Sequence, residues 1–460
     1  MRRNPTLGAA GGAVAAVLGL LAGAIPLTDN SFFTHLATGR LILGGDGFPR
    51  SDPYTWSSAG EPWTVQSWLA SVVYAGAEKL LGSSGPAVVV ALAGAGLALC
   101  VWALSLRAGT IVSRLLVAGP VLVIGLARWA ERPYLFALVF LALTLLACEG
   151  RVDRRVLLPI GWLWVQTNGS WPLGLIAVVL LGVGGRVDTG ALPRERQVLP
   201  WLAGGIALGV LGPYGVRQLF FPVTLLARRE QLMSIIEWRA PTFASADELL
   251  FIVVIGLVVV AIGRQPSWRT VLPFLGFTAL ALTGSRNLEV ACIVFVPIMA
   301  PGLAGLGSID SSERRAVVRP AVAAVSAIGL VLLSGIAAGD GVRLEPYPVP
   351  AIVWLERHDL DPRSHRVVSQ DFVGNYLEAR YGASRAGWVD DRVEVLTSEA
   401  TEDYRALLAG EHDWQVILTR SGAEAVLWEI DQPLTAALTA SPDWRIVLSE
   451  GGYVVAVPSE

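Results

Sequence analysis

The chain has 460 residues, of which 53% are hydrophobic and only 16% are charged, and its formal net charge is −3. Soluble domains carry about 25% charged residues, so the composition excludes an ordinary soluble protein, and the weak net charge gives no indication of a nucleic-acid partner. Apolar runs recur from Leu7 to Ala338, which is typical of a polytopic α-helical membrane protein. Only one of the 35 basic residues is a lysine, Lys79, a bias typical of GC-rich genomes such as those of actinobacteria.

About eleven apolar segments are predicted to cross the membrane. The first follows Arg2 and Arg3; a signal peptide is the alternative interpretation, but the length of the segment favours a span. Several later segments are shorter than the ~20 residues that a full crossing needs, so we expect some of them to be broken or buried within the protein. The predicted spans are residues 7–27, 86–106, 112–127, 133–148, 156–167, 171–185, 199–212, 247–263, 270–284, 287–306 and 317–338.

Arginine placement predicts the orientation of these segments, because short cytoplasmic loops are enriched in Arg and Lys. An odd number of spans with the N-terminus inside puts the C-terminal part outside, at a bacterial plasma membrane. The segment 65–82 is predicted to lie against the outer face or to form a shallow helix; if it spans instead, another short segment does not, or the topology inverts after it. The predicted cytoplasmic loops are residues 1–5, 106–114, 149–155, 185–197, 263–269 and 310–319, and the predicted outer turns are residues 127–133, 166–172, 212–241 and 284–289.

The first outer loop, residues 28–64, is rich in polar side chains. Residues 31–43 predict an amphipathic juxtamembrane helix that carries His35 and Arg40 on its polar side. This helix either rests in the membrane interface or fixes Asp29 at the mouth of a cavity, where a carboxylate would serve as general base for an acceptor hydroxyl. In the second case His35 and Arg40 would bind a phosphate, which the planar fork of Arg suits best.

Further polar and aromatic residues mark the other outer segments. Asp52 and Trp63 lie in an extended Pro/Gly/Ser-rich stretch, where an aromatic face beside a carboxylate is typical of a sugar site, although a boundary Trp is equally typical of the aromatic belt. Polar groups at membrane depth are tolerated only beside a cavity or protein. The remaining candidates either line a cationic cavity for an anionic, lipid-linked substrate or are ordinary turn residues: Arg132, Asn168, Glu237, Trp238 and Arg286.

The C-terminal part differs in composition. Residues 339–350 form a Gly/Pro linker, and residues 351–460 predict a soluble extracytoplasmic α/β domain. Asp390, Asp391 and Arg392 are interpreted as an acidic surface turn after a strand. The predicted strands are residues 366–370, 414–420 and 445–457, and the predicted helices are residues 397–410 and 421–430.

Taken in chain order, these stretches resemble the bacterial GT-C type of membrane glycosyltransferase, which uses polyprenyl-phosphate-linked sugars. The resemblance covers nearly the whole chain. It rests on Asp29 and Trp63 and on the stretches FFTHLATG, PRSDPYTW, SWLASVVY, ERPYLF, WVQTNGS, LGPYG, IIEWRAPTF, GSRNLEVACIVF, VGNYLEARYG and WVDDRVE.

The resemblance implies that Asp29 is the catalytic base of an inverting transfer, in which an acceptor hydroxyl displaces a polyprenyl phosphate from the sugar. It implies that Arg132, Arg239 or Arg286 stabilises the departing phosphate. The implied partners are a polyprenyl-phosphate-linked sugar, membrane lipid and a cell-envelope glycan, lipid or protein acceptor.

The chain departs from the family pattern in four motifs. Ser31 stands where a second acidic residue is expected, Gln66 and Ser67 replace a His-Glu pair, the stretch QTNGS lacks a His, and Gly212 replaces an Asn. These differences leave open whether this branch uses another sugar or has lost catalysis. No cofactor is expected: some members use a divalent metal, but the single acidic residue of the first turn gives that no support.

Two functions of other classes remain open. One is a non-catalytic membrane protein that binds a lipid-linked sugar or a cell-envelope partner. The other is a transporter or flippase, against which the lack of visible inverted repeats counts.

Overall fold

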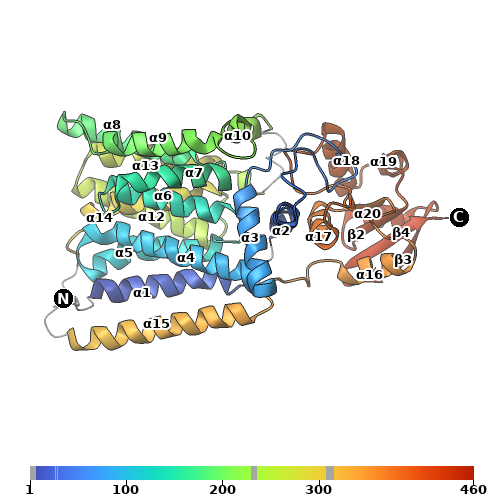
Figure 1. Cartoon of the computed structure of the whole chain (residues 1–460), viewed down its shortest axis with the longest axis horizontal. Coiled ribbons are helices and arrows are strands. Elements are labelled where there is room, and N and C mark those ends of the chain that lie inside the picture. The colour runs from blue at the N-terminus through green and yellow to red at the C-terminus, as the bar shows by residue number, and fades with distance from the viewer. Residues whose placement is uncertain (1–6, 26, 28, 229–235, 307–314, 460) are drawn as a thin grey trace. The chain divides into compact units, whose positions relative to one another are not determined.

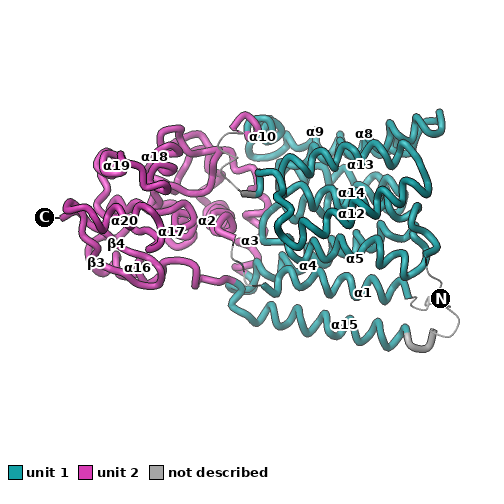
Figure 2. The backbone as a smooth tube through the Cα atoms, turned by 180° about the vertical axis from the view of Figure 1, so that it is seen from behind, with its two compact units in different colours: residues 1–27, 80–224, 232–341 teal, residues 28–79, 225–231, 342–460 magenta. Residues whose placement is uncertain are grey.

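The chain folds into two compact units (Figure 2). Unit 1 consists of residues 1–27, 80–224 and 232–341, and unit 2 of residues 28–79, 225–231 and 342–460. Residues 28–64, the predicted first outer loop, therefore belong to the same unit as the C-terminal segment, although most of unit 1 separates them in the sequence. The structure, a computed structural model, describes residues 7–25, 27, 29–228, 236–306 and 315–459.

Unit 1 is a bundle of apolar helices that run side by side (Figure 1). Its α-helices are α1 (Leu7–Leu20), α4 (Gly85–Leu104), α5 (Ile111–Arg128), α6 (Tyr134–Cys148), α7 (Leu157–Thr167), α8 (Pro172–Thr189), α9 (Glu195–Ala207), α12 (Ala246–Arg264), α13 (Trp268–Thr283), α14 (Asn287–Gly302) and α15 (Arg315–Ala338), together with α10 (Val216–Ala227), whose last residues belong to unit 2. Its short 3₁₀ helices are η1 (Leu21–Gly23), η2 (Gly82–Ser84), η3 (Ser105–Ala108), η4 (Arg154–Val156), η5 (Leu208–Val210) and η6 (Ile236–Trp238).

The core of the bundle lies along α14. Almost every side chain of this helix is buried, including Phe295 and Met299, and it packs against α5, α6, α12 and α13. At another helix pair, α1 and α4, a Cβ on Gly19 would lie 2.3 Å from the carbonyl oxygen of Gly94. Small residues that let two backbones approach this closely are typical of helix packing in membranes.

Five apolar helical stretches of the described residues are long enough to cross a membrane, so the prediction of about eleven spans is wrong. Several predicted spans form helices that are too short. For example, α7 has 11 residues, which extend about 16 Å against a hydrocarbon core of about 30 Å. The five stretches, which fit a helical membrane protein, are Trp68–Ala108, Ile111–Arg128, Pro172–Thr189, Ala246–Arg264 and Val318–Ala338.

Ion pairs connect four of the predicted cytoplasmic loops at one end of unit 1. Glu149 contacts Arg107 at 2.7 Å and Arg269 at 3.1 Å, and Arg269 also contacts Glu195 at 2.7 Å. These four residues come from four different predicted loops, so the grouping of those loops is confirmed, while the side of the membrane that they face stays a prediction. Loop 1–5 and part of loop 310–319 lie outside the described residues.

Unit 2 contains a small mixed sheet with the strand order β1-β2-β4-β3. The first pair is parallel and the other two pairs are antiparallel. The hairpin between β3 and β4 turns at Gly451 and Gly452, which both have positive φ, as a type I′ turn requires. The strands are β1 (Val367–Ser369), β2 (Ala425–Glu429), β3 (Trp444–Glu450) and β4 (Tyr453–Pro458), and the helices are α2 (Asn30–Gly44), α3 (Trp68–Leu81), α16 (Val349–Arg357), α17 (Asp371–Tyr381), α18 (Ser398–Ala409), α19 (Trp414–Ser421) and α20 (Pro433–Ala440).

The structure confirms three of the five elements predicted in the C-terminal part. For the other two, the predicted strand is a helix and the predicted helix contains a strand. The helix at 397–410 is present as α18, because Thr397 Oγ1 accepts a hydrogen bond from the Ala400 N–H and Gly410 ends the helix in a left-handed conformation. The stretch 414–420, predicted as a strand, is helix α19, and 421–430, predicted as a helix, contains strand β2. Short apolar runs do not distinguish a buried strand from a helix by periodicity.

Candidate functional site

A serine at the start of α2 bridges two carboxylates. Asp29 caps the helix, and its Oδ1 accepts a hydrogen bond from the Ser31 backbone N–H at 3.0 Å. The Ser31 hydroxyl donates to Oδ2 of Asp391. All three residues are half-buried. Two carboxylates from opposite ends of unit 2's sequence are thereby held by one residue, Asp29 through its backbone N–H and Asp391 through its hydroxyl.

The surroundings of Asp391 favour proton exchange near neutral pH. Asn375 Nδ2 donates to Asp391 Oδ1 and to Thr34 Oγ1, each at 2.6 Å. Burial raises the pKa of the Asp391 carboxyl to about 7, and its hydrogen-bond donors only partly oppose this rise. The negative charges of Asp390 and Asp29 raise the same pKa further. Near pH 7 this carboxyl is therefore divided between its neutral and charged forms.

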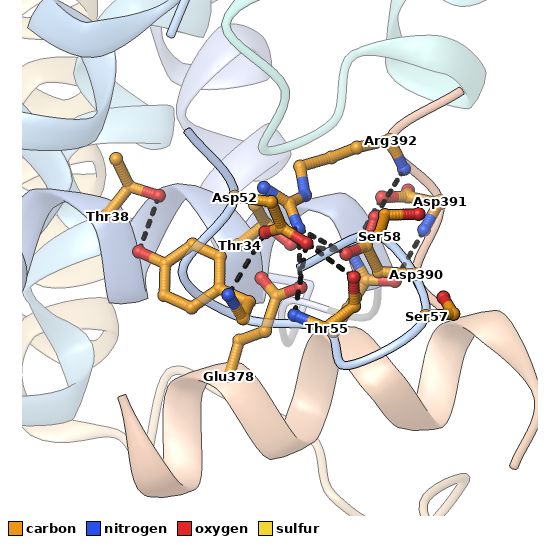
Figure 3. A network of polar contacts seen from close by, with 12 residues as sticks. Thr34, Thr38, Asp52, Thr55, Ser57, Ser58, Glu378, Asp390, Asp391 and Arg392 are labelled. Carbon is orange, nitrogen blue, oxygen red and sulfur yellow. Dashed lines mark hydrogen bonds and ion pairs between the residues drawn. The ribbon is translucent and has the colours of Figure 1, made fainter. Parts of the chain in front are cut away.

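Arg392, which follows Asp391 in the chain, belongs to a buried network of ion pairs (Figure 3). Arg392 Nη2 contacts Asp52 Oδ1 at 2.6 Å and Asp390 Oδ2 at 2.5 Å, and it lies 3.8 Å from Glu378. All four side chains are buried. Burial, followed by the charge of Asp390, raises the pKa of Glu378 well above its usual range. The network thus places one cation against the two aspartates, while the glutamate is favoured in its neutral form.

The predicted substrate residues Asp52 and Trp63 both belong to this Arg392 network. The Trp63 ring lies 4.4 Å from the Arg392 guanidinium, a cation–π contact. Asp52 also accepts hydrogen bonds from the backbone N–H groups of Tyr54 and Thr55. The geometry gives both residues an internal structural role, and a part in substrate binding stays a prediction. The acidic surface turn predicted at residues 390–392 is wrong for Asp390 and Arg392, because both are buried.

His35 and Arg40 each contact another helix of unit 2. The Nδ1 atom of His35 lies 3.1 Å from Ser71 Oγ on α3. Arg40 binds Glu78 through two hydrogen bonds of 2.7 and 2.5 Å, and also donates to the Ala379 carbonyl at 2.7 Å. These contacts hold α2 against α3 and α17, so a phosphate would compete with Glu78 for the Arg40 fork.

Four of the predicted site residues of unit 1 come together. Arg132 Nη1 pairs with Glu237 Oε2. The guanidinium of Arg286 lies 4.7 Å from the ring of Trp238 and 4.7 Å from the ring of Tyr134. Within the described residues Arg286 makes no ion pair, so two aromatic faces hold it and its N–H groups are not committed to a carboxylate.

The same end of unit 1 also contains a balanced charge group. Arg128 Nε contacts Asp247 at 2.5 Å, Arg128 Nη2 lies 3.7 Å from Glu248, and Arg128 Nη1 donates to the Ser285 carbonyl at 3.0 Å. Arg128 and Arg132 are therefore both paired with carboxylates, so this group is of mixed charge and not the predicted cationic cavity. Arg286 is the arginine of the group best placed to bind an anion.

Asn168, the remaining predicted residue, makes a local contact. Its Oδ1 accepts a hydrogen bond from the Ser170 N–H at 3.0 Å and so caps the turn between α7 and α8. This contact supports the turn that joins the two helices, and a role in binding stays a prediction.

Sequence reasoning missed the polar residues of α17. Asn375 and Glu378 are buried three residues apart, which places both on one face of the helix, and Val373 and Leu377 are buried as well. Two polar residues at helical spacing within an otherwise buried face indicate a polar partner inside the protein. That signal, in the stretch VGNYLEARYG, predicts a contact for Asn375 but does not identify Asp391 as its partner.

Among the described residues, no group of three or more His, Cys, Asp or Glu side chains is placed to hold a metal ion. No protein-family model matches the chain, and no curated protein is significantly similar to it.

Proposed function

We propose that the chain is a GT-C-like membrane glycosyltransferase that moves a sugar from a polyprenyl-phosphate donor to an acceptor hydroxyl on the outer face of a bacterial plasma membrane. One observation carries the proposal. Ser31 stands where the family resemblance leads us to expect a second acid, and its hydroxyl contacts Asp391. A second carboxylate is thus supplied to the Asp29 turn from the C-terminal part of the chain.

The proposed reaction is an inverting displacement. The acceptor oxygen attacks the anomeric carbon of the sugar, the bond from that carbon to the phosphate oxygen breaks, and the phosphate leaves with the bonding electrons. Asp29 takes the proton of the acceptor hydroxyl. The Ser31 backbone N–H fixes the orientation of Asp29, and the Ser31 hydroxyl donates to Asp391, whose pKa of about 7 suits it to exchange a proton near neutral pH.

Within unit 1, taken by itself, one arginine is proposed to bind a phosphate. Arg286 is the residue we assign to this role, because its guanidinium is held by the Tyr134 and Trp238 rings. A planar guanidinium pairs with two phosphate oxygens at once. Arg132 would join it only by exchanging its bond to Glu237.

A transfer assay tests the proposal. The purified full-length chain in lipid nanodiscs receives polyprenyl-phosphate hexose and pentose donors, each labelled in the sugar, and a cell-envelope extract as acceptor. We expect wild type and the exposed control Asp46→Asn to transfer label, and Asp29→Asn to be slower by about 10²–10⁴. The proposal fails if wild type transfers no sugar from any donor.

A non-catalytic binding protein for a lipid-linked sugar or a cell-envelope partner is the second candidate. It is favoured by the internal pairing of Arg40 with Glu78 and of Asp52 with Arg392, which commits several predicted site residues to structural contacts. Saturable binding of the labelled donor without any transfer, unchanged in Asp29→Asn, would select this candidate.

A further inference from the structure

A pocket of about 350 Å³ opens at the end of unit 1 where the predicted cytoplasmic loops gather. Its walls come from the end of α6, the turn that follows, η4 and the residues at the start of α9. Arginines dominate the lining, with one acidic residue, Asp153, among them. The four arginines are Arg151, Arg154, Arg155 and Arg194.

The backbone fixes the positions of these arginines. Gly150 ends α6 with φ of +70°, and a Cβ at this position would collide with the guanidinium of Arg194. Arg194 therefore lies directly against the Gly150 backbone. Asp153 Oδ1 accepts a hydrogen bond from the Arg155 N–H at 2.9 Å and so caps η4. The turn after α6 and the capped η4 helix therefore bring the cations together.

The charge of the pocket is unbalanced, unlike that of the adjacent network. Glu149 and Glu195 neutralise Arg107 and Arg269 a short distance away. Within the parts of the chain that the structure describes, Arg151, Arg155 and Arg194 make no ion pair, and Arg154 bonds to the neutral side chain of Gln197.

We propose that this pocket binds a phosphate-bearing headgroup. Guanidinium groups pair with phosphate oxygens through two parallel hydrogen bonds, and a volume of this size is typical of small-ligand sites. Arginine enrichment in cytoplasmic loops explains why such residues occur there, but not why four of them surround one hollow. Anionic phospholipid at the membrane surface is the nearest source of this chemistry, and a soluble phosphate compound is the other.

Thermal unfolding of the full chain in a neutral detergent tests the proposal. Dioleoyl-phosphatidylglycerol, dioleoyl-phosphatidylcholine and inorganic phosphate are titrated separately into wild type and two triple variants. The pocket variant is Arg151→Gln, Arg155→Gln and Arg194→Gln. The control variant is Arg186→Gln, Arg196→Gln and Arg264→Gln, which removes the same charge from exposed arginines outside the pocket lining.

We expect phosphatidylglycerol to raise the melting temperature of wild type and of the control variant, and the pocket variant to need about tenfold or more lipid for the same rise. Stabilisation by inorganic phosphate alone, lost in the pocket variant, would keep the phosphate site and assign it to a soluble ligand. The proposal is overturned if phosphatidylcholine stabilises wild type equally, or if both triple variants respond to phosphatidylglycerol alike.

The single variant Arg155→Gln guards against a folding defect in the triple variant. The Arg155 side chain is exposed, so we expect its removal to leave the melting temperature without lipid unchanged while weakening the response to phosphatidylglycerol. An unchanged response in this variant, together with a misfolded triple variant, would also overturn the proposal.

Discussion

Asp390 and Asp391 are adjacent in the sequence but have opposite surroundings. Asp390 is buried and contacts the Arg392 guanidinium at 2.5 Å. Asp391 is half-buried, and it accepts hydrogen bonds from the Ser31 hydroxyl and the Asn375 amide rather than from a cation. Burial, opposed only in part by the hydrogen bonds from Ser31 and Asn375, raises the pKa of the Asp391 carboxyl to about 7. A carboxylate paired with a cation is therefore suited to a structural role, whereas a buried carboxyl with neutral donors and a raised pKa is suited to proton transfer.

Loss of the cation from the buried network should have the largest effect on stability. Arg392→Gln leaves Asp52 and Asp390 buried without a counter-charge, which typically costs about 3–5 kcal/mol. Thermal unfolding and protease sensitivity of unit 2 measure this effect, with exposed Arg445→Gln as the control. If the two variants unfold alike, the Arg392 network does not stabilise unit 2, and the contrast between Asp390 as a structural acid and Asp391 is wrong.

Replacement of Asp391 should reduce transfer without unfolding the protein. Asp391→Asn keeps an oxygen to accept from Asn375, and we expect a rate loss of about 10² under the proposed function. The wild-type rate should fall below pH 7, where Asp391 becomes protonated. This fall should be absent in the variant. A wild-type and a variant profile with the same midpoint near pH 7 would assign that titration to another group.

The same substitution should change how stability depends on pH. Folding raises the pKa of Asp391 from 3.8 to about 7, so between these values the folded state binds more protons than the unfolded state. The Asp391 contribution to the free energy of unfolding is therefore full below pH 4 and decreases by about 1.4 kcal/mol for each pH unit up to 7. Denaturant unfolding of wild type and Asp391→Asn at pH 5 and pH 7 should show a smaller decrease in the variant. A parallel decrease in both would mean that Asp391 is not the buried acid described.

The smallest expected effect concerns Arg40. Its bond to Glu78 joins two side chains that are 44% and 23% exposed, and surface pairs of this kind contribute about 0–1 kcal/mol. We expect Arg40→Gln and Glu78→Gln to unfold within that range of wild type, and a double-variant cycle to give a similarly small coupling. A transfer defect in Arg40→Gln as large as that of Asp29→Asn would indicate instead that Arg40 binds the substrate.

The sequence predicts elements well where local chemistry decides them. Thr397 caps the start of α18, and Gly410 ends it in a left-handed conformation. Both signals can be recognised from the residue types alone. Likewise, arginine placement grouped the loops that contain Arg107, Glu149 and Arg269. The exchange of α19 and β2 shows the limit, because long-range pairing of β2 with β1 and β4 decides that assignment.

The candidate site was predictable only in part for the same reason. Asp29 and Arg286 follow from their positions in outer turns. The contacts of Ser31 with Asp391 and of Asp52 with Arg392 join residues that are 360 and 340 positions apart, and no local pattern encodes such a pairing. The predicted number of spans was wrong because several of the predicted segments form helices shorter than a full crossing, such as α7 with 11 residues and α6 with 15.

The pairing of Asp52 with Arg392 also determines how late in synthesis unit 2 can be completed. Chains grow at about 5–20 residues per second during synthesis, so the 340 residues between the two partners take about 20 to 70 seconds to emerge. During that interval the first outer loop has been made but has neither the cation for Asp52 nor the aspartate for Ser31. Unit 2 is therefore completed only when the last quarter of the chain arrives, and a truncated product would leave its first loop unassembled.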